Sequence, residues 1–133
     1  MDTSISVLVI DDSPIMTRVV SQLLQKCGFK DVAQAPEVLA AFQLLRKNSF
    51  RLIICDIEMQ PMNGIEFLRA IRAEPTTRDI AFVLMTATRD PATVLEANRL
   101  NVDGYLLKPF TAETLHERLS RIPKLNPPTV LDT

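Results

Sequence analysis

The side chains best suited to chemistry in this chain follow short apolar runs. Asp11 and Asp12 stand side by side after the run VLVI, and Asp56 directly follows LIIC. Thr86 follows a third run, and Lys108 follows a fourth. Two adjacent carboxylates repel each other, so water or a cation must lie close to the pair. These five side chains can act together only if the fold brings them to one place.

The apolar runs themselves are typical of strands that helices bury on both faces. They cover residues 7–10, 52–55, 82–85 and 105–107. A weaker run at 32–35, interrupted by Gln34, predicts a strand near a sheet edge. Strand and helix alternate five times, and parallel neighbours need helical crossovers, so the sequence predicts an α/β fold with an open parallel sheet.

Proline, glycine and capping residues mark the expected helices. The first helix has Pro14 in its first turn, Pro36 opens the second, and Gly64 precedes the third. The fourth starts at Asp90-Pro91 and the fifth at about Thr111. The first helix carries Val19 on its apolar stripe and ends near Gly28. In the second, we expect Leu39, Phe42 and Leu45 to face inward.

Composition limits the class of protein. A chain of 133 residues with 47% hydrophobic content fits one domain. Lys and Arg number 15 against 16 Asp and Glu, so nothing drives direct binding to nucleic acid. No apolar run reaches the ~18 residues of a membrane span and MDTSIS is no signal peptide, so we expect a cytoplasmic protein without membrane contact. Two cysteines and one histidine cannot form a structural zinc site.

The expected domain covers residues 1–123. The remainder, 124–133, reads KLNPPTVLDT, with two adjacent prolines and little periodicity. Such a composition predicts a flexible tail or a linker.

The polar residues at the strand ends should meet, because parallel strands point the same way and open α/β sheets bind ligands at their carboxyl edge. Three clustered carboxylates attract a hard cation such as Mg²⁺. Asp56 is suited to act as a nucleophile toward phosphorus, because it is already ionised and needs no general base. A cation, the Lys108 ammonium and the Thr86 hydroxyl are the groups that would neutralise the phosphoryl oxygens.

Four segments together resemble the landmarks of the response-regulator receiver domain, the family that includes the chemotaxis protein CheY. They are VLVIDDS, LIICDIEM with the following Gly64, VLMTA and YLLKPF, and the resemblance covers about residues 6–121. It implies a doubly wound, flavodoxin-like (βα)5 fold with strand order 2-1-3-4-5.

The resemblance also implies a role for each residue. Asp56 would accept a phosphoryl group from a phosphohistidine of a sensor histidine kinase or phosphotransfer protein in a two-component phosphorelay. Asp12 and Asp56 would hold Mg²⁺ with the backbone carbonyl of Glu58, and Asp11 would act through water. Lys108 would pair with the phosphoryl group.

A conformational switch is part of the same resemblance. Thr86 would turn toward the phosphoryl group and Tyr105 would follow, changing the face made by the fourth helix, the fifth strand and the fifth helix. A downstream protein target or an output domain would read that face, either from a monomer or from a phosphorylation-dependent dimer. The chain would thus be a signalling domain rather than an enzyme. The bond from Lys108 to Pro109 matches one that is usually cis in this family.

Some positions depart from the family pattern. Gln60 stands where proline is common, Asn101 where glycine is usual, and Gly104 where a larger residue is usual. Glu58 and Thr88 occupy positions that, in the family, tune how fast water removes the phosphate.

The same residues are open to other interpretations. Asp11 and Asp12 could form a simple helix cap, and Tyr105 could be an ordinary half-buried aromatic residue. A magnesium-dependent hydrolase of the haloacid dehalogenase type would use an aspartyl phosphate, but its second aspartate would fall at Ser13. A flavodoxin would bind a phosphate where Asp11 and Asp12 repel one.

Overall fold

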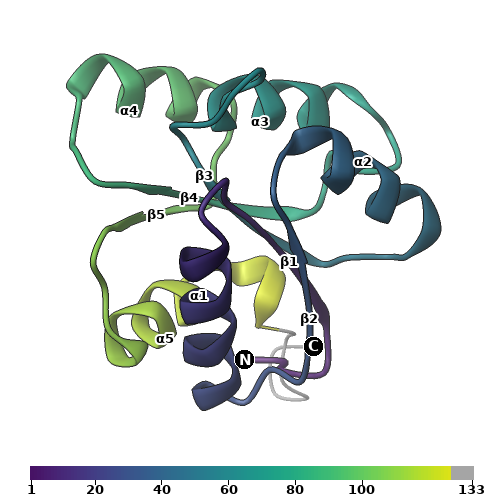
Figure 1. Cartoon of the computed structure of the whole chain (residues 1–133), viewed down its shortest axis with the longest axis vertical. Helices are drawn as coiled ribbons and strands as arrows, with labels where there is room; N and C mark the ends of the chain where they lie inside the picture. Colours follow the sequence, from purple (N-terminus) through teal and green to yellow (C-terminus); the bar gives the residue numbers. More distant parts are fainter. Residues whose placement is uncertain (127–133) are drawn as a thin grey trace.

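The computed structural model describes residues 1–126 and contains five strands, five α-helices and one short 3-10 helix (Figure 1). The strands are β1 (Ser6–Ile10), β2 (Asp31–Ala35), β3 (Leu52–Asp56), β4 (Ala81–Thr86) and β5 (Gly104–Leu107). The helices are α1 (Pro14–Lys26), α2 (Val38–Lys47), α3 (Gly64–Ala73), α4 (Pro91–Arg99), α5 (Ala112–Ser120) and the 3-10 helix η1 (Pro123–Leu125). Within the described residues, no helix combines the length and apolarity that crossing a membrane requires.

The strands form one parallel sheet in the order β2-β1-β3-β4-β5, which confirms the fold and the strand order implied by the resemblance. β2 lies at an edge, as its weaker apolar run predicts. The register aligns the strand ends: Ile10 pairs with Cys55, and Asp56 with Met85. The residues that end or follow the strands therefore share one edge of the sheet.

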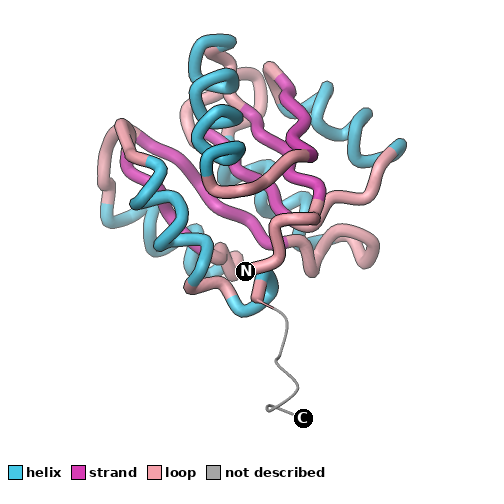
Figure 2. The backbone as a smooth tube through the Cα atoms, turned by 90° about the horizontal axis from the view of Figure 1, so that it is seen from below, coloured by secondary structure: helices cyan, strands magenta, loops and turns pink. Residues whose placement is uncertain are grey.

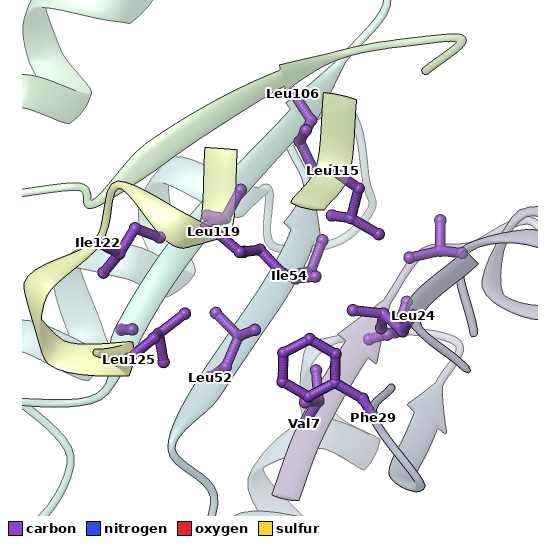
Figure 3. Packing of buried hydrophobic residues seen from close by; sticks show 14 of the residues in the cluster. Val7, Leu24, Phe29, Leu52, Ile54, Leu106, Leu115, Leu119, Ile122 and Leu125 are labelled. Carbon is purple, nitrogen blue, oxygen red and sulfur yellow. The ribbon is translucent and has the colours of Figure 1, made fainter. Parts of the chain in front are cut away.

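Helices cover both faces of the sheet (Figures 1 and 2). Alternate strand residues point to opposite faces. Val7 and Val9 join a core cluster with α1 and α5, whereas Leu8 and Ile10 join a second cluster with α2, α3 and α4. Figure 3 shows the first cluster, in which Leu24 of α1 and Leu115 of α5 approach the central strands. Strands covered on both faces explain why the runs are continuously apolar.

Capping side chains set the helix starts. Ser13 caps α1 by accepting a hydrogen bond from the Met16 N–H, and Pro14 occupies the first turn. Asn63 and Glu66 form a reciprocal capping box on α3. After α1, Gly28 has a φ of 105°, which glycine adopts without strain.

The expected start of the second helix and one of its expected inward residues were wrong. The second helix begins at Val38 rather than at Pro36, because the Glu37 carboxylate caps it by accepting from the N–H groups of Leu39 and Ala40. Its inner stripe runs through Val38, Ala41, Phe42 and Leu45, with helical spacing i, i+3, i+4, i+7. Leu39 lies one position off this stripe and is 63% exposed.

The inner stripe of α1 follows the same spacing and excludes Val19 in the same way. It runs through Thr17, Val20, Ser21 and Leu24, and Val19 is 39% exposed. Two of the four inward positions are hydroxyl residues, so hydrophobicity alone pointed to the wrong neighbour. The Ser21 hydroxyl donates to the Thr17 carbonyl at 2.7 Å, which satisfies it inside the core.

The first residues of the expected tail continue the fold. Leu125 is 1% exposed and packs in the first core cluster (Figure 3). Its carbonyl accepts a hydrogen bond from the Asp2 N–H at 2.9 Å, and the Asn126 amide donates to the carbonyls of Ser120 and Ile122. Residues 124–126 are therefore held at several points, whereas the rest of the expected tail, 127–133, lies outside the described residues.

Candidate functional site

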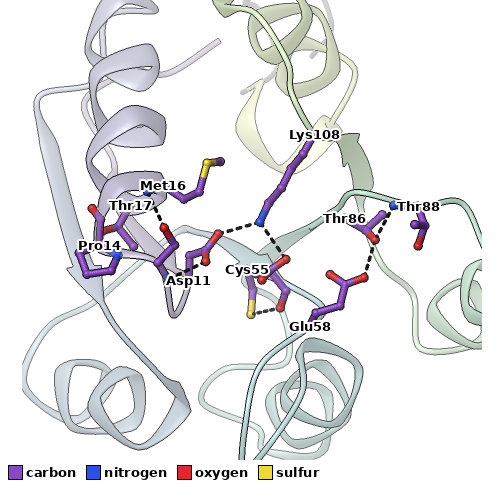
Figure 4. Close-up of polar contacts among 11 residues, drawn as sticks. Asp11, Pro14, Met16, Thr17, Cys55, Glu58, Thr86, Thr88 and Lys108 are labelled. Atoms are coloured by element: carbon purple, nitrogen blue, oxygen red, sulfur yellow. Dashed lines mark hydrogen bonds and ion pairs between the residues drawn. The ribbon is translucent and has the colours of Figure 1, made fainter.

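The carboxyl edge of the sheet gathers the polar side chains predicted to meet there. Asp11 follows β1, Asp56 and Thr86 are the last residues of β3 and β4, and Lys108 follows β5. Figure 4 shows the Lys108 ammonium beside Asp11, with Thr86 and Glu58 on its other side. The carboxylates of Asp11, Asp12 and Asp56 offer oxygen atoms that all lie within 4.8 Å of one another.

The two adjacent aspartates have different surroundings. Asp11 is 1% exposed, and its two oxygens accept hydrogen bonds from the Ser13 N–H at 3.0 Å and from Lys108 Nζ at 2.8 Å. Asp12 is exposed. Ser13 is the residue that caps α1, so the simple capping reading does not account for the pair. The Asp11 carboxylate is therefore held in place by two hydrogen bonds, whereas the Asp12 carboxylate is accessible to a cation from solvent.

Asp56 is a buried carboxylate that has few polar partners. It is 4% exposed, and Lys108 Nζ lies 3.1 Å from its Oδ1 as an ion pair. Among the described residues, this buried oxygen has no partner with hydrogen-bond geometry. A buried carboxylate oxygen is costly unless a nearby charge or hydrogen bond compensates it, and in the described structure the Lys108 ammonium is that charge.

Burial raises the pKa of Asp56 to about 6, an effect opposed by its contact with Lys108 and reinforced by the negative charge of Asp11. Burial acts to lower the pKa of Lys108, but the hydrogen bond to Asp11 and the contact with Asp56 outweigh it and raise that pKa. The site therefore holds a permanent ammonium beside a carboxylate that is mostly ionised at neutral pH.

These residues fit a hard divalent cation. Three clustered carboxylates supply the oxygen ligands that Mg²⁺ prefers, and one ammonium does not balance their charge. Apart from the Lys108 ammonium, Asp56 Oδ1 has no polar partner among the described residues, so it retains capacity for a cation. The acidic cluster can therefore bind a metal ion, and the coordination by the Glu58 carbonyl stays a prediction.

Thr86 has a partner that sequence reasoning missed. Thr86 is 5% exposed. Its hydroxyl donates a hydrogen bond to Glu58 Oε1 at 2.9 Å, and the same oxygen accepts one from the Thr88 N–H at 3.2 Å (Figure 4). Nothing in the sequence signals this contact, because it joins residues 28 positions apart and depends on two side-chain rotamers.

Comparison with known proteins agrees with the fold and the site. The family model for the response regulator receiver domain matches residues 7–120. The chain belongs to this family. It is a CheY-like receiver domain of two-component signalling, and this membership disfavours the alternative of a haloacid dehalogenase-type hydrolase.

Curated relatives match the receiver over most of its length. Chemotaxis protein CheY-3 of Vibrio cholerae serotype O1 is 34% identical over 122 residues, which span 92% of this chain and 94% of the relative. Chemotaxis protein CheY of Pseudomonas aeruginosa is 34% identical over 116 residues, 87% of this chain and 94% of that one. The solved structure of Vibrio cholerae CheY4 superposes with a TM-score of 0.83 at 32% identity, covering 90% of this chain and 98% of that chain.

The expected switch aromatic of this receiver borders an open cleft. Tyr105 is half-buried, and its hydroxyl donates a long 3.4 Å hydrogen bond to the Thr93 carbonyl of α4. A cleft of about 440 Å³ beside it is lined by residues that include Glu58, Thr86 and Phe110. The cleft leads from the site toward α4, β5 and α5, the elements of the expected output face.

The loop after Asp56 is held close to the acceptor strand of the receiver. The Gly64 N–H donates to the Ile57 carbonyl at 2.9 Å, and a Cβ at Gly64 would lie 2.3 Å from the Asp56 carbonyl oxygen. Only glycine allows this approach. The loop contains a cis bond between Gln60 and Pro61, at the place where the sequence departs from the family.

One further expectation about the receiver backbone is confirmed, since the bond from Lys108 to Pro109 is cis. Asn101, in the usual place of glycine, has a φ of 59°. Asparagine tolerates this left-handed conformation better than most residues.

Proposed function

We propose that this receiver domain accepts a phosphoryl group on Asp56 from the phosphohistidine of a histidine kinase or a phosphotransfer protein. The observation that carries the proposal is the buried Asp56 carboxylate. Among the described residues its Oδ1 has only the Lys108 ammonium, at 3.1 Å, as a partner, and two further carboxylates lie beside it. Such a group is poised for a cation and a transferred phosphoryl group rather than for structural pairing.

The proposed transfer needs no general base. An oxygen of the ionised Asp56 attacks phosphorus, the new P–O bond forms as the P–N bond of the donor breaks, and the imidazole leaves with the electron pair. With a pKa of about 6, Asp56 is mostly in this ionised form at neutral pH. The Lys108 ammonium, held by Asp11 at 2.8 Å, offsets charge on the phosphoryl oxygens.

The carboxylates of Asp12 and Asp56 and the backbone carbonyl of Glu58 would hold Mg²⁺, with Asp11 acting through water. When bound, the ion supplies positive charge that offsets both the carboxylates and the phosphoryl oxygens. Asp12 is suited to this role because it is exposed and carries no ammonium partner at ion-pair distance among the described residues.

Signal output would depend on Thr86 and Tyr105. Thr86 turns its hydroxyl to the phosphoryl group, Tyr105 moves into the cleft beside it, and the face of α4, β5 and α5 changes its affinity for a protein target or an output domain. The domain thus acts as a binding module in signalling rather than as an enzyme with turnover. We assign this unit to residues 1–123, extended by the packed residues 124–126.

Incubation with Mg²⁺ and acetyl phosphate, followed by intact-protein mass spectrometry, tests the proposal. The wild-type chain gains the mass of one phosphoryl group, and Asp56→Asn gains none. Asp79→Asn, which removes an exposed carboxylate, is the matched control and gains the group like wild type. Equal modification of Asp56→Asn and wild type would refute the assignment.

Tyrosine fluorescence tests the switch. Tyr105 is the only tyrosine and the chain has no tryptophan, so intrinsic emission reports on this residue alone. Phosphorylation changes the emission of wild type and leaves that of Thr86→Ala nearly unchanged. An unchanged emission in phosphorylated wild type would remove Tyr105 from the switch.

A further inference from the structure

The Thr86 hydroxyl is already engaged in the structure. A threonine hydroxyl carries a single hydrogen to donate, and here it is directed to Glu58 Oε1 at 2.9 Å. The oxygen meanwhile accepts from the Thr88 N–H at 3.2 Å. Thr86 therefore has no free hydrogen for a group on Asp56 until the contact with Glu58 breaks.

Glu58 is held where this contact forms. It lies two residues after Asp56, in a turn fixed by the Met59 N–H and the Gly64 N–H, both of which donate to the Ile57 carbonyl. Met59 is 3% exposed and anchors the turn in the core, whereas Glu58 itself is exposed. The restraint on Glu58 thus comes from the backbone of the loop, and its carboxylate spans from that loop to the end of β4.

We propose that Glu58 is a positioning residue that retains Thr86 in the resting conformation and so sets the threshold for switching. The inference rests on the proposed function. A phosphoryl group on Asp56 can accept a hydrogen bond from the Thr86 hydroxyl only after Thr86 breaks its hydrogen bond to the Glu58 carboxylate. A ligand shifts a conformational equilibrium only by its difference in affinity for the two states. The free energy needed to break the Thr86–Glu58 hydrogen bond therefore reduces the net affinity with which a phosphoryl group favours the switched state.

Glu58 also contributes negative charge near Asp56, which must be separated from the hydrogen bond. Glu58→Gln keeps an acceptor oxygen at the same place and removes the charge, whereas Glu58→Ala removes both. The comparison between these two variants isolates the hydrogen bond. Because Glu58 is exposed, neither variant removes a buried contact of the core.

The experiment measures the affinity for beryllofluoride, a phosphoryl analogue, by calorimetry in excess Mg²⁺. Glu58→Ala binds about fivefold more tightly than Glu58→Gln, the size expected of one hydrogen bond. In the Thr86→Ala background the two Glu58 variants bind equally, because the contact has no second partner. Equal affinities of Glu58→Ala and Glu58→Gln with Thr86 present, or a difference that persists without Thr86, would overturn the proposal.

A second measurement needs no phosphoryl analogue. Three-bond couplings across the Cα–Cβ bond of Thr86 report its rotamer in the resting protein by NMR. Wild type and Glu58→Gln show a single rotamer, and Glu58→Ala shows averaging; one rotamer in all three proteins would contradict the restraint. Failure of the proposed function is seen separately, as beryllofluoride binding that is absent in wild type or unchanged in Asp56→Asn.

Discussion

Lys108 and Asp11 lie 97 positions apart in the chain, and their Nζ and Oδ2 atoms are 2.8 Å apart in the fold. The same ammonium lies 3.1 Å from Asp56 Oδ1, so one lysine joins the ends of β1, β3 and β5. Asp11 and Asp56 are both nearly inaccessible to water. Their charges consequently depend on this single cation in the metal-free protein.

Removal of that cation destabilises the fold. Lys108→Ala lowers the free energy of unfolding at pH 7.5 in EDTA by about 2–3 kcal/mol, because it leaves two buried carboxylates without their ammonium. Urea denaturation measures the loss. Lys30→Ala, an exposed lysine, stays within about 0.5 kcal/mol of wild type. Added Mg²⁺ reduces the loss of unfolding free energy in Lys108→Ala. Equal losses in the two variants would contradict a stabilising ion pair between Lys108 and the buried carboxylates.

The pH dependence of stability has a defined sign at Asp56. Its pKa is about 6 in the folded protein, above the ordinary aspartate pKa of 3.8, so the folded state holds the proton more tightly. In the metal-free protein, this carboxyl therefore stabilises the fold below about pH 4, and the contribution is lost as pH rises through 6.

Asp56→Asn removes this dependence. In EDTA it is about 1–3 kcal/mol more stable than wild type at pH 7.5, and the advantage disappears near pH 4. Urea midpoints across this range measure the effect, with Asp79→Asn as the control of equal charge. An Asp56→Asn advantage that is independent of pH would show that repacking, not ionisation, causes it.

The affinity for Mg²⁺ tests whether Asp12, the exposed residue of the aspartate pair, is a metal ligand. Asp12→Asn weakens Mg²⁺ binding at least about tenfold, ~1.4 kcal/mol, because a carboxylate ligand is lost. Stability without metal changes little, since Asp12 is exposed. Calorimetric titration with MgCl₂ measures the affinity. Unchanged affinity would exclude Asp12 from the metal site.

Two glycines respond oppositely to an added methyl group. Gly64→Ala destabilises the domain by about 1–3 kcal/mol, because its Cβ would lie 2.3 Å from the Asp56 carbonyl oxygen and the backbone must shift. Gly104→Ala is neutral or stabilising by up to about 1 kcal/mol, since its Cβ would meet a Val83 methyl at an ordinary 3.7 Å. Thermal unfolding compares the two, and similar losses would refute the distinction.

Leu125 tests where the domain ends. Leu125→Ala lowers the free energy of unfolding by about 2–4 kcal/mol, because the side chain is 1% exposed in the core. Leu39→Ala removes the same atoms from a 63% exposed position and costs less than about 1 kcal/mol. Should both substitutions cost the same in urea, residues 124–126 would not belong to the folded unit.

The order of the elements and the residues that end the strands can be predicted from the amino-acid sequence. Continuous apolar runs specified strands buried on both faces, and parallel pairing then required Asp11, Asp56, Thr86 and Lys108 to share an edge. Proline and capping residues located most helix starts. These features depend on neighbours along the chain, so the local pattern carries them.

The neighbours that each side chain meets become known only from the folded structure. It buried Asp11 and exposed Asp12, turned Thr86 to Glu58, packed Leu125 and left Leu39 in water. In each case the deciding contact joins segments that are distant in the chain or depends on a one-position rotation of a helix. Such choices are settled by packing and by the burial of charge, neither of which a local sequence pattern records.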